Sequence, residues 1–134
     1  MKQTDSHSSS RGQASQVRSE LRSLMSASGD GINAAAAMTG DGLVIASILD
    51  PGVDADRFAA MSASLLALAE RQIEEIERGS LVQLMIEGTR GAVLLVRAGT
   101  DAVLAVSTNP GAMMGRIFID TRKAARQLES VLNA

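Results

Sequence analysis

The sequence predicts a single α+β domain whose elements run helix, two strands, long helix, three strands, helix. Three segments repeat apolar residues at helical spacing, five short apolar runs lie between turn residues, and the loops between neighbouring strands hold only a few residues. Parallel strands need a crossover of roughly a dozen residues, so these short connections predict antiparallel pairing. A chain of 134 residues has the usual length of one domain with one core.

The N-terminal segment is rich in serine, poor in apolar residues, and contains the only histidine, His7. Such a segment buries too little apolar surface to offset the entropy lost on ordering. We therefore expect a flexible tail over residues 1–13 and a folded domain over 14–134. A lone histidine in a tail is expected to be solvated, with no role as ligand or base.

The first helix is predicted over 14–28, where apolar residues recur at i, i+4, i+7 and i+8 from Val17. Two strands, 32–38 and 43–48, follow around the turn Gly40-Asp41-Gly42 and form a hairpin. Alanines in the first strand favour helix by propensity, but seven residues bounded by glycines are too short for a stable helix. Asp41 is explained by turn chemistry and is not expected to be catalytic.

A long helix over 54–78 is predicted to be the longest element, with its large apolar stripe packed on the sheet. The stripe consists of Phe58, Met61, Leu65, Leu68, Ile73 and Ile76. The opposite face is small for two turns, with Ala60, Ala63, Ser64 and Ala67, and then becomes charged from Glu70 and Arg71 onward. Small residues at this spacing let a second helix approach across a two-fold axis. The alternative is that alanine simply favours helix and contacts nothing, and the residues leave both interpretations open.

Three further strands are predicted over 81–87, 92–98 and 102–107. The last helix is expected to begin with Asn109 as the cap and Pro110 at the first helical position. Its inward residues are Met113, Met114, Ile117, Thr121, Ala124, Leu128 and Val131. Its outward residues Arg122, Lys123 and Arg126 form a basic ridge that is expected to be a solvated face.

Composition excludes several functions. The net charge is −2, from 13 basic and 15 acidic residues, and aromatic residues are 1% of the chain, so binding of nucleic acid is not expected. The chain has no cysteine, and no apolar run long enough to be a secretion signal or a membrane span, so we expect a cytoplasmic protein that does not insert into a membrane.

No catalytic residue, cofactor site or metal site is predicted. The letters Gly-x-Gly-x-x-Ala at 29–34 match a dinucleotide fingerprint, but here they leave a helix and open a strand, which is the wrong context. The carboxylates of Glu70, Glu74, Glu75 and Glu77 alternate with Arg71 and Arg78, which favours a lattice of surface ion pairs over an acid–base site.

The segment Gly40-Asp41-Gly42-Leu43-Val44-Ile45-Ala46-Ser47 resembles the D-G-x-x-I-A-S stretch of the Roadblock (dynein light-chain-like) family. The alanine- and leucine-rich helix, the strands at 81–87 and 91–96, and Asn109-x-Gly111-x-x-x-Gly115 follow in the family's order over residues 16–132. The resemblance implies a five-stranded antiparallel sheet, with the long helix on one face and the terminal helices on the other.

The resemblance also implies a homodimer joined through the long helix and the third strand into one continuous sheet. The expected interface residues are Ala60, Ala63, Ser64, Ala67, Glu70, Arg71, Val82 and Leu84. Compact bacterial members of the family regulate or accompany Ras-like small GTPases, so the resemblance implies a GTPase-binding regulator that is not an enzyme. A passive scaffold subunit and a small-molecule sensor domain are the alternatives. Arg90 is the arginine to inspect for a role as an arginine finger, although such a regulator need not supply one.

Overall fold

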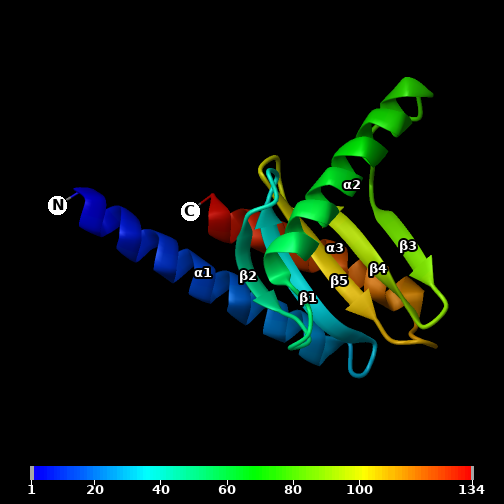
Figure 1. The fold of residues 1–134 in the computed structure, drawn as a ribbon, viewed down its shortest axis with the longest axis horizontal. Coiled ribbons are helices and arrows are strands. Elements are labelled where there is room, and N and C mark those ends of the chain that lie inside the picture. Colours follow the sequence, from blue (N-terminus) through cyan, green and yellow to red (C-terminus); the bar gives the residue numbers. More distant parts are fainter. Residues whose placement is uncertain (1, 134) are drawn as a thin grey trace.

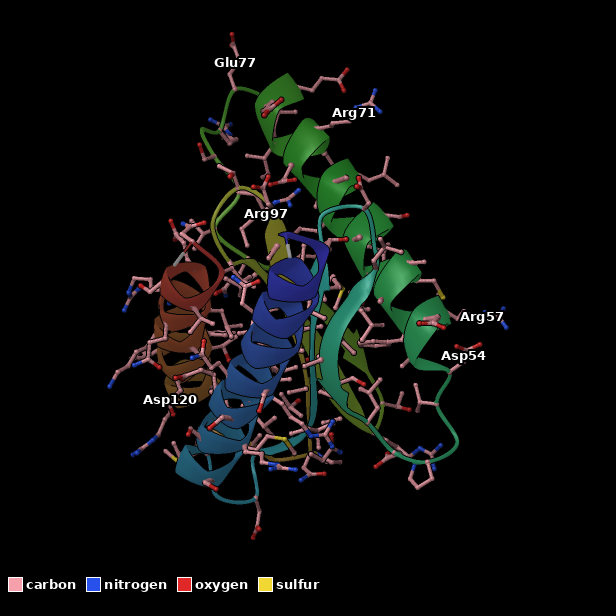
Figure 2. All side chains as sticks on the ribbon, turned by 90° about the vertical axis from the view of Figure 1, so that its left-hand side faces the viewer. Asp54, Arg57, Arg71, Glu77, Arg97 and Asp120 are labelled. Atoms are coloured by element: carbon pink, nitrogen blue, oxygen red, sulfur yellow. The ribbon has the colours of Figure 1, made fainter. Side chains whose placement is uncertain are left out.

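The computed structural model describes the backbone of residues 2–133 and the side chains of residues 12–133. The helices are α1 (Lys2–Ala27), α2 (Ala55–Glu75) and α3 (Met114–Leu132). The strands are β1 (Ile32–Thr39), β2 (Val44–Ile48), β3 (Leu84–Gly88), β4 (Gly91–Arg97) and β5 (Ala102–Thr108). The elements form three layers, with α1 and α3 side by side on one face of the sheet and α2 alone on the other (Figures 1 and 2). The predicted α+β class and element order are confirmed.

The sheet has the strand order β2-β1-β5-β4-β3, and each neighbouring pair is antiparallel. Strands β1 and β5 pair over their full lengths at the centre, and β2 and β3 form the two edges. The alanine-rich segment is therefore a buried central strand, because its small side chains let helices approach both faces of the sheet.

The β1–β2 hairpin closes at the predicted Asp-Gly turn. Gly42 has a φ of 89°, a left-handed conformation that strains residues with a side chain. A Cβ atom at Gly42 would also lie 2.8 Å from the Cα of Ala60 on α2. The turn therefore requires glycine both for its own shape and because the hairpin presses against α2.

The core is divided by the sheet into two halves. On one side, Leu21 of α1 and Leu128 of α3 pack with Leu104 and Val106 of β5. On the other side, Leu66 of α2 is buried among side chains of β1, β4 and β5, chiefly Met38, Leu95 and Val103.

Some element boundaries differ from the prediction. Helix α1 begins at Lys2, so residues 2–13, which were expected to form a tail, are helical in the structure. With 26 residues, α1 is longer than α2, which has 21. Mobility of this segment stays a prediction. The prediction that α2 is the longest element was wrong.

The predicted start of the last helix was also wrong. Helix α3 starts at Met114, because Asn109 is engaged elsewhere. Its side chain donates to the backbone oxygen of Asp30 and accepts a 2.9 Å hydrogen bond from Asn33, so it links the α1–β1 and β5–α3 connections. Met113, expected to face inward, is largely exposed.

Candidate protein-binding surface

Helix α2 is rotated relative to the prediction. Its buried residues are Ala59, Ser62, Ala63 and Leu66, and they face the sheet. The larger apolar side chains of Met61, Leu65 and Leu68 point to solvent, with exposed fractions of 56%, 40% and 60%. The predicted stripe therefore does not pack on the sheet as a unit, although Phe58 remains partly buried there.

Small residues face the sheet because the strands already supply large side chains at this contact. Leu95 and Val103 are fully buried under α2, and a close-packed interior has no room for a second large layer between them and the helix backbone. The exposed face consists of Ala60, Met61, Ser64, Leu65 and Leu68, which line a shallow open groove of about 370 Å³.

The structure places the eight predicted interface residues in different environments. Ala60, Ser64, Ala67, Arg71 and Val82 are exposed, and Leu84 is half-buried on β3. Ala63 is only 4% exposed and contributes to the packing of α2 on the sheet, so it does not belong to the free face. Ala60 lies against the β1–β2 hairpin.

The remaining predicted interface residue, Glu70, forms an internal ion pair. Its carboxylate accepts two hydrogen bonds from Arg97 of β4, of 2.9 Å from Nε and 2.6 Å from Nη2. The hydrogen bond from Arg97 lowers the pKa of the Glu70 carboxyl, against the opposing effect of partial burial. This bidentate pair attaches the C-terminal third of α2 to the sheet.

Beyond Glu70 the helix has few contacts. Residues 71–80 are exposed apart from half-buried Ile73, and this end of α2 extends past the sheet, with Arg71 and Glu77 at its far end (Figures 1 and 2). The ion-pair lattice expected here is absent from the described side chains, whose salt bridges join Arg97 to Glu70 and Arg116 to Asp120.

Strand β3 is an open edge. It pairs with β4 alone, so one row of its backbone hydrogen-bonding groups has no partner strand. Met85 and Ile86 on this strand, Val82 before it and Ile76 at the end of α2 are all exposed apolar residues. The C-terminal end of α2 and the open edge strand β3 lie on the same side of the molecule (Figure 1).

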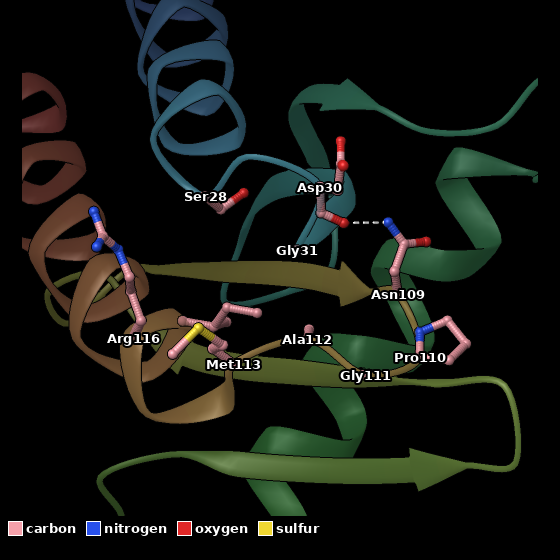
Figure 3. Close-up of a pocket in the computed structure, with 10 residues that line it drawn as sticks. Ser28, Asp30, Gly31, Asn109, Pro110, Gly111, Ala112, Met113 and Arg116 are labelled. Atoms are coloured by element: carbon pink, nitrogen blue, oxygen red, sulfur yellow. Dashed lines mark hydrogen bonds between the residues drawn. The ribbon is translucent and has the colours of Figure 1, made fainter.

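A separate pocket of about 320 Å³ lies between the α1–β1 connection and the start of α3 (Figure 3). Asn109 bridges the two connections at its edge, as Figure 3 shows. The charged residues that line it are Asp30 and Arg116. Ser28 also lines it, but its hydroxyl donates to the backbone oxygen of Met25 and accepts from the backbone nitrogen of Ile32. Within residues 12–133 no three acidic or histidine side chains gather as a metal site would require.

Arg90 is exposed in the two-residue turn between β3 and β4. Among the helices of residues 2–133, none has an apolar stretch long enough to cross a bilayer.

Comparison with known proteins identifies the family. A profile of the Roadblock/LC7 domain matches residues 18–108. The uncharacterised protein MJ1340 of Methanocaldococcus jannaschii is 39% identical over 102 residues, which cover 76% of this chain and 89% of that protein.

Solved structures share the fold. A Roadblock/LC7 domain from Streptomyces avermitilis superposes with a TM-score of 0.79 at 21% identity, covering 87% of this chain and 98% of that one. MglB in a tetrameric arrangement superposes with a TM-score of 0.78 at 18% identity, covering 89% of both chains. The chain therefore belongs to the Roadblock/LC7 family, whose members are adaptor and regulatory domains.

Proposed function

We propose that this protein is a cytoplasmic homodimeric regulator without catalytic residues of its own, which binds a Ras-like small GTPase and modulates its GTPase cycle. The observation that carries the proposal is the exposed apolar face of α2 beside the open edge of β3. A soluble monomer rarely leaves so continuous a set of large apolar residues in water, whereas binding surfaces commonly contain one.

The dimer forms by antiparallel pairing of β3 with β3 of a second copy, which gives one ten-stranded sheet. This pairing removes the open edge and supplies partners for its free backbone groups. The two-fold axis is perpendicular to the sheet, so both α2 helices lie on the same face. The overhanging end of each α2, with Ile76, then lies over the partner's sheet and not in solvent.

The refined interface keeps Arg71, Val82 and Leu84 from the predicted set and adds larger residues. Leu65, Leu68, Ile76, Met85 and Ile86 supply most of its apolar surface. Ala63 is left out because it packs inward, and Glu70 contributes through the position that Arg97 gives it. Family membership and the tetrameric arrangement of MglB, a structural neighbour, both support self-association.

The paired α2 helices present a wide, firmly held surface, which suits binding of the mobile loops of a GTPase. A partner that holds the switch loops in their hydrolytic conformation accelerates GTP hydrolysis without donating a side chain to the phosphates. Exposed Arg90 is therefore not required as an arginine finger, and we expect Arg90→Ala to retain any stimulation.

The alternative is a scaffold subunit that binds a GTPase and leaves its turnover unchanged. A sensor that binds a small molecule between the sheet and α2 is less well supported, because the cavity there measures about 100 Å³ and is lined mostly by apolar residues, among them Phe58. Ligand pockets usually measure roughly 300 Å³ or more.

Dimerisation is tested by light scattering on the 134-residue chain and two variants. Leu68→Glu places a charge on the exposed α2 face, and Leu43→Glu makes the same change at a leucine of similar exposure, 67% against 60%, on the hairpin. We expect a dimer for the wild type and Leu43→Glu, and a folded monomer for Leu68→Glu. A monomeric wild type, or a fully dimeric Leu68→Glu, would contradict the proposed interface.

Regulation is tested by phosphate release from GTP-loaded Ras-like GTPases with and without an excess of the protein. Acceleration that is retained by Leu43→Glu and lost in Leu68→Glu supports regulation through the α2 surface. Binding of the GTPase with an unchanged rate selects the scaffold, and no binding to any GTPase tested refutes both.

A further inference from the structure

The overall charge of −2 conceals a separation of charge between the two helical layers. On α2 and the segments next to it, acidic residues predominate, as at Asp54, Asp56, Glu74, Glu75 and Glu77. In the opposite layer, built from α1 and α3, basic residues predominate, and one of them, Arg18, reaches the sheet and donates to the backbone oxygen of Ser47 on β2. The two layers are separated by the whole thickness of the sheet (Figure 2).

The outer face of α3 is a basic cluster with an apolar centre. Ile119, Arg122, Lys123 and Arg126 occupy positions i, i+3, i+4 and i+7, which lie on one side of a helix. That side is opposite the buried residues of α3, such as Ile117 and Leu128. Ile119 is 65% exposed although it is surrounded by charged neighbours.

Acidic residues of this layer flank the cluster but are outnumbered, with three acidic against six basic residues on α3 and the part of α1 from residue 12 onward. Glu20 and Asp120 line a cleft between α1 and α3 together with Lys123, and Asp120 lies 3.6 Å from Arg116. Glu129 is exposed one turn after Arg126 and lies over the β4–β5 connection, with its Cγ 2.9 Å from the position that a Cβ at Gly99 would take.

The outer face of α1 continues the same surface without adding negative charge. Arg22 is exposed there together with serines 15, 19 and 26. The two helices lie side by side (Figure 2). Because the serine side chains are short, the layer offers a broad surface on which the longer exposed side chains of Ile119, Lys123 and Arg126 stand out.

From this arrangement we propose that the α1–α3 layer docks onto an anionic membrane surface, with Lys123, Arg126 and Arg22 facing phosphate headgroups and Ile119 entering the interface. Basic residues near an anionic bilayer attract it, and an apolar side chain among them adds a shallow insertion. Complementary charge selects the occupant, because Arg22 and the three basic residues of the cluster outnumber Glu129, the exposed acidic residue one turn after Arg126.

A membrane fits the surface better than an acidic peptide does. The cleft beside the cluster is lined by two acidic residues, Glu20 and Asp120, and one basic residue, Lys123, so an acidic chain entering it would meet a net negative charge. A planar anionic surface contacts the protruding residues without entering the cleft.

The proposed dimer strengthens this binding, and this one step rests on the proposed function. A two-fold axis perpendicular to the sheet places both α1–α3 layers in the same plane, so that two clusters meet one bilayer together. Two linked weak sites bind far more tightly than either alone. The surface formed by the paired α2 helices remains free on the opposite side of the sheet.

The experiment is flotation of the full chain with phosphatidylcholine vesicles, either pure or containing about 30% phosphatidylglycerol, at about 50 mM salt, where charges on the two surfaces are weakly screened. We expect the protein to float with the anionic vesicles and not with the neutral ones, and to be released at about 500 mM salt. Arg126→Glu should lower the apparent affinity about tenfold and Ile119→Ser about fivefold. Arg126→Lys keeps the positive charge and should bind anionic vesicles like the wild type.

The matched control is Arg57→Glu, an identical change of charge at an exposed arginine at the start of α2. Absence of binding to anionic vesicles, or an equal loss in Arg57→Glu and Arg126→Glu, overturns the proposal. Binding of polyglutamate without vesicle binding would also overturn it, in favour of an acidic protein partner. The monomeric variant Leu68→Glu should bind anionic vesicles more weakly than the wild type, and adding Arg126→Glu should weaken its binding further. Failure of the proposed dimer is therefore distinguishable from failure of the proposed membrane site.

Discussion

Substitution of Ala63 by glutamate tests which face of α2 contacts the sheet. If the small residues of α2 formed the dimer interface, Ala63→Glu would yield a folded monomer. In the structure Ala63 is 4% exposed and its neighbours Ala59, Ser62 and Leu66 are buried against the sheet. The glutamate would then enter the core between α2 and the strands.

The size of the effect follows from this position. A carboxylate without a partner in a packed interior costs about 3 to 5 kcal/mol, and the added side-chain atoms have no cavity to fill. A domain is stable by only about 5 to 15 kcal/mol. At roughly 3 to 4 °C per kcal/mol for this length, we expect the melting temperature to fall by about 10 to 20 °C.

Circular dichroism during thermal unfolding, with light scattering at low temperature, is the assay. The control is Ala67→Glu, one helical turn later on an exposed position of α2, where the fold should tolerate the charge. A variant Ala63→Glu that melts like the wild type but is monomeric would refute the observed rotation of α2. That result would instead support the dimer interface predicted from the small residues of α2.

Three further substitutions test individual contacts. Gly42→Ala should destabilise the protein by about 1 to 3 kcal/mol in urea unfolding, because of its positive φ and the 2.8 Å approach to Ala60, whereas Gly52→Ala, with open space around it, should not. Asn109→Ala should cost about 1 to 3 kcal/mol by separating the α1–β1 and β5–α3 connections, and an unchanged urea midpoint would contradict that linking role. Glu70→Gln tests the ion pair with Arg97: since the pKa of Glu70 is lowered in the folded state, its stabilisation is present above the unfolded pKa and disappears as pH falls through the folded pKa. The free energy of unfolding of the wild type should therefore exceed that of Glu70→Gln by on the order of 1 kcal/mol at pH near 7. The difference should vanish at acidic pH below the folded pKa. A difference in urea midpoint that stays constant across that pH range would contradict the argument.

Local signals in the sequence were sufficient for the order of elements. The Asp-Gly turn at Asp41 and Gly42 determines the first hairpin by its own backbone geometry, and the short loops between later strands leave only antiparallel pairing. These features depend on neighbours in the chain, so the sequence pattern contains them directly.

The start of α3 could not be found in this way. Asn109-Pro110 has the residue types of a helix N-terminus, but Asn109 forms its hydrogen bonds with Asn33 and the backbone of Asp30. These partners are more than 70 positions away, and only the folded chain brings them together. A local pattern cannot distinguish a cap from a long-range bridge.

The rotation of α2 was missed for a related reason. The prediction assigned the larger apolar stripe to the core, although an amphipathic pattern shows only that two faces differ. Which face turns inward depends on the volume that the opposing surface leaves free, and Met38, Leu95 and Val103 already fill it here. Small residues at 59, 62 and 63 therefore fit against the strands around Leu66, and Met61, Leu65 and Leu68 remain outside.

The same rotation bears on how the proposed dimer would be held together. Small residues facing outward would allow close helix contact but offer little apolar area, whereas outward Leu65 and Leu68 offer much more. Pairing through β3 alone would join two edges with few side chains, and the long overhang of α2 would stay solvated. Large side chains on α2 let the helix and the strand bury surface together, so that the sheet pairing and the helix contact each require the other. An interface of that kind is broken by one charge on α2 even though the paired strands themselves are untouched, which is why Leu68→Glu is a stronger test of the dimer than any change in β3.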